Sequence, residues 1–217
     1  MPTAIPSSYH FSGLTSTNGA ASGERYLIFF ITGNPGLIAY YETFLSHLHA
    51  LLSTLPAAQS GNASFDVCGR SLKGFETTEG KNELHGWADV SASQPGTHPP
   101  FGLQAQIEEI EGSVRKLVQE EIRSGREAPK VILMGHSVGS YILLEVLRRH
   151  RERMAAWKSN CDKIPDEGLR IVAGICLFPT VTHIGKSTSG RRLTVCCLNF
   201  FYCPDWDMHT QHGIRRD

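Results

Sequence analysis

The sequence lacks the excess of positive charge that nucleic-acid-binding proteins carry, because 21 Lys and Arg residues balance 21 Asp and Glu residues. This balance, without a basic stripe, argues against a nucleic-acid partner. No apolar run reaches the roughly 18 residues that a membrane-spanning helix needs, so we expect no transmembrane span. The N-terminus has no basic stretch followed by an apolar core, and we therefore expect no secretory signal.

Metal-type cysteine spacing is also missing. The six cysteines contain no paired half-sites of zinc-binding type, and this usage suits a reducing compartment. The segment Gly33-Asn34-Pro35-Gly36 is neither a dinucleotide-binding fingerprint nor a phosphate-binding loop. We therefore expect neither a bound metal nor a nucleotide cofactor.

Short apolar runs alternate with amphipathic stretches along most of the chain. Strands that are apolar on both faces and alternate with helices are typical of a parallel sheet covered on both sides. The pattern therefore predicts an α/β fold with a mostly parallel sheet. The predicted strands cover residues 26–32, 65–68, 131–134 and 171–178, and the predicted helices cover residues 38–53, 103–123 and 138–151.

The ends of the chain differ in composition from its middle. Residues 1–25 are polar and predict a loose lead-in with a short strand near Ser8–Ser12. Residues 69–102 break the periodicity, and an excursion of this length is usually a functional loop or disordered. Residues 26–193 carry the strand and helix pattern, whereas residues 194–217 form an atypical tail rich in cysteine and aromatic residues.

The motif that carries chemistry is Gly135-His136-Ser137-Val138-Gly139, which matches G-x-S-x-G between a predicted strand and a predicted helix. In this context the serine lies on a sharp strand-to-helix turn that exposes its hydroxyl. Small residues on both sides of the turn let the helix and the strands approach closely, and the helix N-terminus favours developing negative charge. The motif predicts Ser137 as a nucleophile; the alternative is an accidental Gly and Ser turn.

A nucleophilic serine needs two backbone N–H groups that stabilise the oxyanion. One comes from the residue after the nucleophile, here Val138, and the other comes from the loop after an earlier strand. Gly33-Asn34-Pro35-Gly36 occupies that place, and Asn34 is the first candidate, with Gly33 and Leu37 as neighbours. The alternative is an ordinary Asn-Pro-Gly turn.

Three segments together resemble the lipid droplet-associated hydrolases. The first is Phe30–Phe44, which contains Gly-Asn-Pro-Gly and Tyr40-Tyr41. The second is Gly135–Tyr141, which contains the G-x-S-x-G motif, and the third is Leu177–Thr180 with the later Ser187–Leu193. The resemblance covers about residues 24–193. It implies an α/β-hydrolase fold, a serine hydrolase mechanism and a lipid ester substrate such as a sterol ester or an acylglycerol. It further implies association with the lipid droplet surface and lipid storage, with the cytoplasm and the endoplasmic reticulum as further locations.

The chain departs from this family after Leu193, where the similar pattern stops. In the α/β-hydrolase fold the catalytic acid and histidine follow the serine on two later loops. We therefore expect a truncated domain that lacks its last strands and contains no assigned acid or histidine. Asp205, Asp207, His209 and His212 follow Ser137 in the correct order, but their close spacing would place both groups on one loop. His183 is another candidate base, with a surface position as the alternative. We expect His136 to pack or hydrogen-bond beside the serine, and Asp66 to cap or to face water.

Two functional hypotheses follow from the sequence. The first is a serine ester hydrolase in which Ser137 attacks the ester while Val138 and Asn34 hold the oxyanion. The alternative is a catalytically inactive form that acts as a lipid-surface or interaction protein, or a fragment without activity, because a serine without its base is a poor nucleophile.

Overall fold

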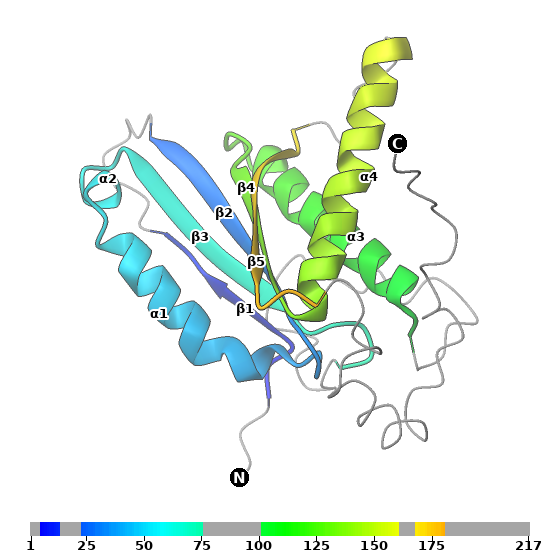
Figure 1. The fold of residues 1–217 in the computed structure, drawn as a ribbon. Coiled ribbons are helices and arrows are strands. Elements are labelled where there is room, and N and C mark those ends of the chain that lie inside the picture. Colours follow the sequence, from blue (N-terminus) through cyan, green and yellow to red (C-terminus); the bar gives the residue numbers. More distant parts are fainter. Residues whose placement is uncertain (1–4, 14–22, 76–100, 161–167, 181–217) are drawn as a thin grey trace, which may run out of the picture. The chain divides into compact units, whose positions relative to one another are not determined.

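The computed structural model describes residues 5–13, 23–75, 101–160 and 168–180. Within these residues, five strands form one sheet in the order β1-β3-β2-β4-β5 (Figure 1). All neighbouring strands pair in parallel except β1, which pairs antiparallel with β3. The predicted mostly parallel sheet is confirmed. The strands are β1 (Ser8–Phe11), β2 (Glu24–Ile31), β3 (Ala63–Arg70), β4 (Lys130–His136) and β5 (Arg170–Leu177).

Helices cover both faces of the sheet, as the sequence predicts (Figure 1). The short helix η1 (Ile38–Tyr41) leads into α1 (Glu42–Ser53), and α2 (Pro56–Gln59) follows; α1 lies on one face. The helices α3 (Leu103–Arg123) and α4 (Val138–Asn160) lie on the other face. Among the described helices, none combines the length and the apolar character needed to cross a bilayer.

The helix α4 continues to Asn160, beyond the end near Arg151 that the apolar pattern predicts. Ion pairs one turn apart lie along the middle of this helix. Arg148 contacts Glu145 at 2.6 Å and Glu152 at 2.5 Å, and pairs at this spacing stabilise helices. Past the predicted end, Arg153 pairs with Glu111 of α3 at 3.1 Å, a contact that the apolar pattern does not reveal.

The central strand β2 carries the core on both of its faces. Ile28 and Phe30 pack with Ile38 and Leu45 of η1 and α1. The alternate residues point to the opposite face, because successive side chains of a strand alternate. That face forms the larger cluster with α3 and α4, which includes Leu27, Phe29, Ile31, Ile107, Ile110, Val114, Ile142, Leu143 and Val146.

Asp66 has a structural role inside β3. Its carboxylate accepts a hydrogen bond from the Gly13 amide at 2.7 Å and pairs with Arg25 at 3.3 Å. The strand predicted at residues 65–68 is present but longer, because β3 begins at Ala63 and continues to Arg70. Two residues further on, burial raises the pKa of the Cys68 thiol, which keeps this side chain neutral within the core.

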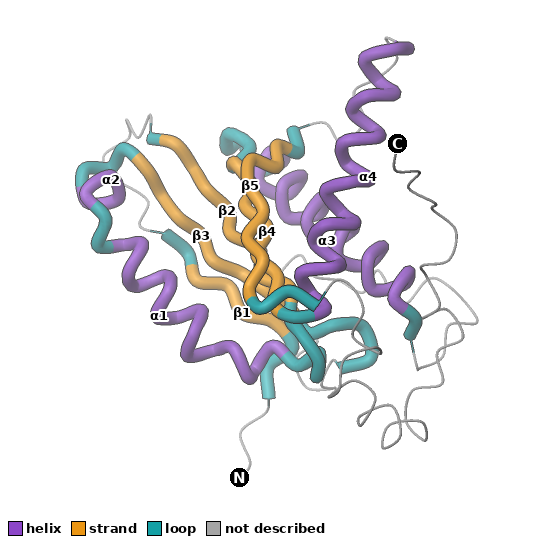
Figure 2. The backbone as a smooth tube through the Cα atoms, viewed as in Figure 1, coloured by secondary structure: helices purple, strands orange, loops and turns teal. Residues whose placement is uncertain are grey.

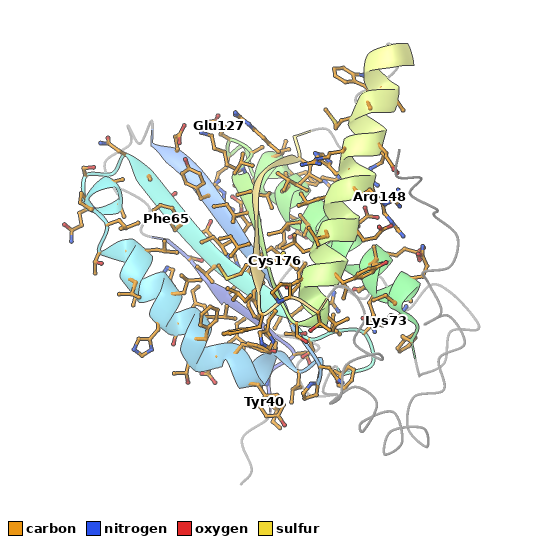
Figure 3. The ribbon with its side chains drawn as sticks, in the orientation of Figure 1. Tyr40, Phe65, Lys73, Glu127, Arg148 and Cys176 are labelled. Carbon is orange, nitrogen blue, oxygen red and sulfur yellow. The ribbon has the colours of Figure 1, made fainter. Side chains whose placement is uncertain are left out.

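Strand β5, which lies at the edge of the described sheet, differs from its prediction as a buried strand. Most of its residues are exposed, including Val172 at 42% and Ile175 at 39%, and Figure 3 shows Cys176 on this strand. In the described part of the chain β5 pairs with β4 on one side only. On one face Leu143 and Leu147 of α4 approach Gly174, so the strand is partly covered there.

The structure tests the predicted N-terminal lead-in but not the predicted C-terminal tail. The short strand expected near Ser8–Ser12 is present as β1, whereas β2 already begins at Glu24. Residues 194–217, on which the tail prediction rests, lie outside the described residues, as does most of the predicted excursion at 69–102.

Candidate active site

The loops that leave the carboxyl ends of the parallel strands meet at one end of the sheet (Figure 2). Ser137 lies there, between the last residue of β4, His136, and the first residue of α4, Val138. Its φ of 53° is in the left-handed region, which a residue with a side chain rarely adopts. The strained strand–turn–helix context predicted for the serine elbow (residues 135–139) is therefore present.

The two glycines of the serine elbow are required by contact with backbone. A Cβ atom added at Gly135 would lie 2.4 Å from the carbonyl oxygen of Gly139. A Cβ atom added at Gly139 would lie 2.4 Å from the carbonyl oxygen of Ile31 on β2. Both separations are too short for a side chain, so only glycine fits at these two positions. The glycines therefore let the start of α4 lie close to the preceding turn and to the central strand β2.

The glycine loop (residues 33–37) follows β2 and contacts the serine elbow directly. A Cβ atom added at Gly33 would lie 2.6 Å from Nδ1 of His136 and 2.9 Å from Cβ of Ser137. The loop that the sequence assigns to oxyanion binding therefore lies beside the predicted nucleophile. Asn34 is exposed within this loop, and Val138 is half-buried at the start of α4.

Tyr41, at the end of η1, connects the glycine loop to the serine elbow. Its hydroxyl accepts a hydrogen bond from the Gly33 amide at 3.1 Å and lies 2.9 Å from Nδ1 of His136. A hydroxyl that accepts from Gly33 can still donate its own proton to Nδ1 of His136. The ring of Tyr41 also packs against Phe30, with 4.7 Å between the centroids.

Hydrogen bonds from the segment after β3 hold the other side of the glycine loop. The Ile38 amide donates to Oγ of the buried Ser71 at 3.1 Å, and the Leu72 amide donates to the Gly36 carbonyl at 2.7 Å. Gly36 also contacts Leu72 and Phe75, since a Cβ atom added there would lie 2.7 Å from each side chain. The loop is thus fixed from two directions before any ligand binds.

The segment after β5 contacts Ser137. The Ser137 amide donates to the Leu177 carbonyl at 3.0 Å, and the Thr180 amide donates to the Ser137 carbonyl at 3.3 Å. The hydroxyl oxygens of Ser137 and Thr180 lie 3.1 Å apart, so either can donate to the other. In the described part of the chain, Thr180 is the hydrogen-bonding partner of the Ser137 side chain.

Two ionisable residues of α4 near the serine elbow have shifted pKa values. Burial raises the pKa of Tyr141, and the neighbouring carboxylate of Glu145 adds to this effect. Hydrogen bonds from Arg148 and then from Arg149 lower the pKa of Glu145 to about 2, against an opposing effect of burial. These groups therefore keep their usual charge at neutral pH.

The other candidate residues have separate outcomes. His136 has the packing and hydrogen-bonding role expected of it, through Tyr41 and an edge contact with Phe178 at 6.1 Å between the centroids. The remaining candidate acids and histidines, His183, Asp205, Asp207, His209 and His212, lie outside the described residues. Among residues 5–13, 23–75, 101–160 and 168–180, no group of three or more His, Cys, Asp or Glu side chains is suited to hold a metal.

Comparison with known proteins agrees with this architecture. The sheet order, the strained serine between β4 and α4, and the glycine loop after β2 define an α/β-hydrolase. The sequence model of the lipid-droplet associated hydrolase family matches residues 24–206 of this chain. The chain belongs to the lipid droplet-associated hydrolase family.

Relatives of this family occur in several animals. The mouse lipid droplet-associated hydrolase is 29% identical over 182 residues, which cover 83% of this chain and 46% of that protein. The human protein is 28% identical over 179 residues, covering 82% and 45%, and the fruit fly protein is 27% identical over 179 residues, covering 82% and 46%. The chain spans about half the length of the curated relatives it matches.

Solved structures with a similar arrangement include esterases. Esterase B from Lactobacillus rhamnosis, inhibited by a tributyrin phosphonate, is 14% identical with a TM-score of 0.42, covering 88% of this chain and 59% of that one. Brefeldin A esterase, described as a bacterial homologue of human hormone sensitive lipase, is 14% identical with a TM-score of 0.40, covering 89% and 46%.

Proposed function

We propose that this protein is a serine ester hydrolase that acts on lipid esters of the sterol ester or acylglycerol type, with Ser137 as the nucleophile. The observation that carries the proposal is the positive φ of Ser137 at the turn from β4 into α4. The fold holds a side chain in a strained conformation at the position where an α/β-hydrolase exposes its nucleophile. A serine in this role attacks the ester carbonyl and forms an acyl-enzyme, which water then hydrolyses.

The backbone N–H groups of Val138 and Asn34 would bind the oxyanion. Val138 is the first residue of α4, where an amide has no acceptor within the helix and the helix dipole favours negative charge. On the glycine loop, the Gly33 amide already donates to Tyr41. This contact supports Asn34 as the second donor, because it is the next amide along a loop that touches the serine elbow.

The family supports the proposed lipid substrate and the proposed place of action. Its name supports association with lipid droplets, and we propose the droplet surface as the site of action and lipid storage as the process. The cytoplasm and the endoplasmic reticulum are further proposed locations. No cofactor is needed for this reaction, because the serine and its oxyanion donors act with a general base.

A fluorophosphonate probe, which reacts covalently with an activated serine, tests the proposal on the purified 217-residue chain. We expect labelling that Ser137→Ala abolishes and that Ser46→Ala, a change on α1 away from the site, leaves intact. Near-ultraviolet circular dichroism shows whether each variant is folded. A folded chain that does not react, or labelling that survives Ser137→Ala, would contradict Ser137 as the nucleophile.

One observation favours a second function. The Ser137 hydroxyl has Thr180 as its partner in the described part of the chain, and a neutral hydroxyl cannot act as a base. A protein without a base would serve as a catalytically inactive lipid-surface or interaction protein. The expected result is then a folded chain that floats with triolein droplets coated in phosphatidylcholine but does not react with the fluorophosphonate.

A further inference from the structure

Two residues with side chains have positive φ in the described part of the chain, and they occupy adjacent turns. Ser137 has a φ of 53° after β4, and Phe178 has a φ of 47° after β5. The strands β4 and β5 are parallel neighbours, so both turns lie at the same end of the sheet. The strain at Ser137 is explained by the serine elbow, whereas the strain at Phe178 needs a separate reason.

Burial does not provide that reason. Phe178 is 84% exposed, so its ring gains little from packing, apart from its edge contact with His136. A bulky residue in the left-handed region is held there by its surroundings at a cost in free energy, and such residues cluster at functional sites. The stabilising contacts therefore have to come from the backbone around Phe178.

Those contacts converge on Ser137. The carbonyl of Leu177, just before Phe178, accepts a hydrogen bond from the Ser137 amide. The amide of Thr180, two residues after Phe178, donates a hydrogen bond to the Ser137 carbonyl. Two backbone bonds thus bind the second turn to the first. The result is that the Thr180 hydroxyl lies 3.1 Å from the Ser137 hydroxyl.

We propose that the turn Phe178–Thr180 is a second elbow, and that Thr180 is a positioning residue that holds the Ser137 side chain in one rotamer. When the Thr180 hydroxyl donates to Oγ of Ser137, the Ser137 proton is free to point toward a base. The same bond restricts rotation about χ1 of Ser137, which has three staggered positions when unrestrained. The expected effect on reactivity rests on the proposed ester hydrolase function, whereas the effect on the rotamer does not.

The experiment separates the hydroxyl of Thr180 from its shape. Thr180→Val removes the hydroxyl and keeps a branched side chain of similar size, and Thr180→Ser restores the hydroxyl. Thr43→Val, at an exposed position of α1, controls for the general effect of this substitution. In each protein, three-bond couplings between Hα and the two Hβ protons of Ser137 report its rotamer, and the fluorophosphonate reports its reactivity.

We expect couplings of one staggered rotamer in the unaltered chain, averaged couplings in Thr180→Val, and recovery in Thr180→Ser. Labelling should slow by about two- to tenfold in Thr180→Val, as the loss of one hydrogen bond implies. The melting temperature should stay close to that of Thr43→Val. Fixed couplings in Thr180→Val, or averaging that Thr180→Ser does not reverse, would overturn the proposal. If no protein reacts but the couplings change as expected, the hydrolase function fails and the positioning role stands.

Discussion

The hydroxyl of Tyr41 lies 2.9 Å from Nδ1 of His136, although the two residues are 95 positions apart in the sequence. Because the same hydroxyl accepts the Gly33 amide, it bridges the glycine loop and the serine elbow. The bridge fixes the position of the proposed oxyanion donors relative to Ser137. Such preorganisation is the means by which an active site stabilises developing charge without rearranging.

The change Tyr41→Phe tests this bridge by removing one oxygen. The Gly33 amide then loses its acceptor, so we expect its hydrogen exchange to become faster. Fluorophosphonate labelling of Ser137 should slow by about two- to tenfold, since one hydrogen bond is lost. The neighbouring Tyr40, which is 71% exposed and lies in η1 just before α1 (Figure 3), provides the control Tyr40→Phe. Unchanged Gly33 exchange in Tyr41→Phe would show that the bridge is not formed in solution.

Adding one methyl group should have opposite effects at two glycines of the helices. At Gly139 the new Cβ meets the Ile31 carbonyl, so Gly139→Ala should destabilise the fold by about 1–3 kcal/mol or more. At Gly112 in α3 nothing lies within 4 Å of the new atom, so Gly112→Ala should stabilise it by about 0.5–1 kcal/mol. Urea unfolding measures both changes. A stable Gly139→Ala variant would mean that α4 does not approach β2 this closely.

Loss of the Ser71 hydroxyl should weaken the support of the glycine loop from the side of β3. The Ile38 amide donates to this buried hydroxyl at 3.1 Å. In Ser71→Ala the amide is left without an acceptor inside the protein, and such a group costs about 1–3 kcal/mol. Urea unfolding of Ser71→Ala beside Ser60→Ala, at an exposed position after α2, measures this difference. Equal unfolding free energies for the two variants would argue against the bond.

The pH dependence of stability should include a contribution from Glu145. Its pKa falls from 4.5 to about 2 in the folded state, mainly because Arg148 donates hydrogen bonds to it. A lowered acid pKa stabilises the fold above the unfolded value, and this stabilisation is lost as the pH falls from 4.5 toward about 2. Glu145→Gln should therefore cost about 1 kcal/mol or less at neutral pH, since the pair is partly exposed, and the cost should shrink below about pH 4.5.

Urea unfolding of Glu145→Gln at several pH values measures this contribution. Glu152→Gln, whose side chain is 62% exposed, is the matched control on the same helix. Figure 3 shows their shared partner Arg148 on α4. A cost that stays constant between neutral pH and about pH 3 would mean that the charge of Glu145 contributes nothing.

Local patterns in the sequence predict most of the fold. The run 131–134 lies within β4 and the apolar periodicity of 103–123 coincides with α3, because both depend on near neighbours in the chain. The burial of β5 could not be predicted in this way. An apolar strand has the same composition at the centre and at the edge of a sheet, and only the pairing partners separate the two cases.

The candidate site is predictable to a similar extent. The motif around Ser137 predicts the turn on which the serine lies. The Gly-Asn-Pro-Gly segment predicts a loop close to this turn, where Gly33 contacts the serine elbow. Tyr41 and Thr180 belong to segments that resemble the family, but nothing in their spacing indicates that either contacts the serine elbow. Both contacts arise from the parallel pairing of β2, β4 and β5, which brings distant turns to one edge.

The backbone contacts of Gly135 and Gly139 also determine which positions of this site tolerate substitution. Because a methyl group at either position would lie 2.4 Å from a carbonyl oxygen, variation there should destabilise the fold. Phe178, which is 84% exposed and contacts His136 beside the serine, is a position where a side chain can be changed without such a clash. The glycines of the serine elbow would then stay unchanged while the exposed side chain beside it is varied.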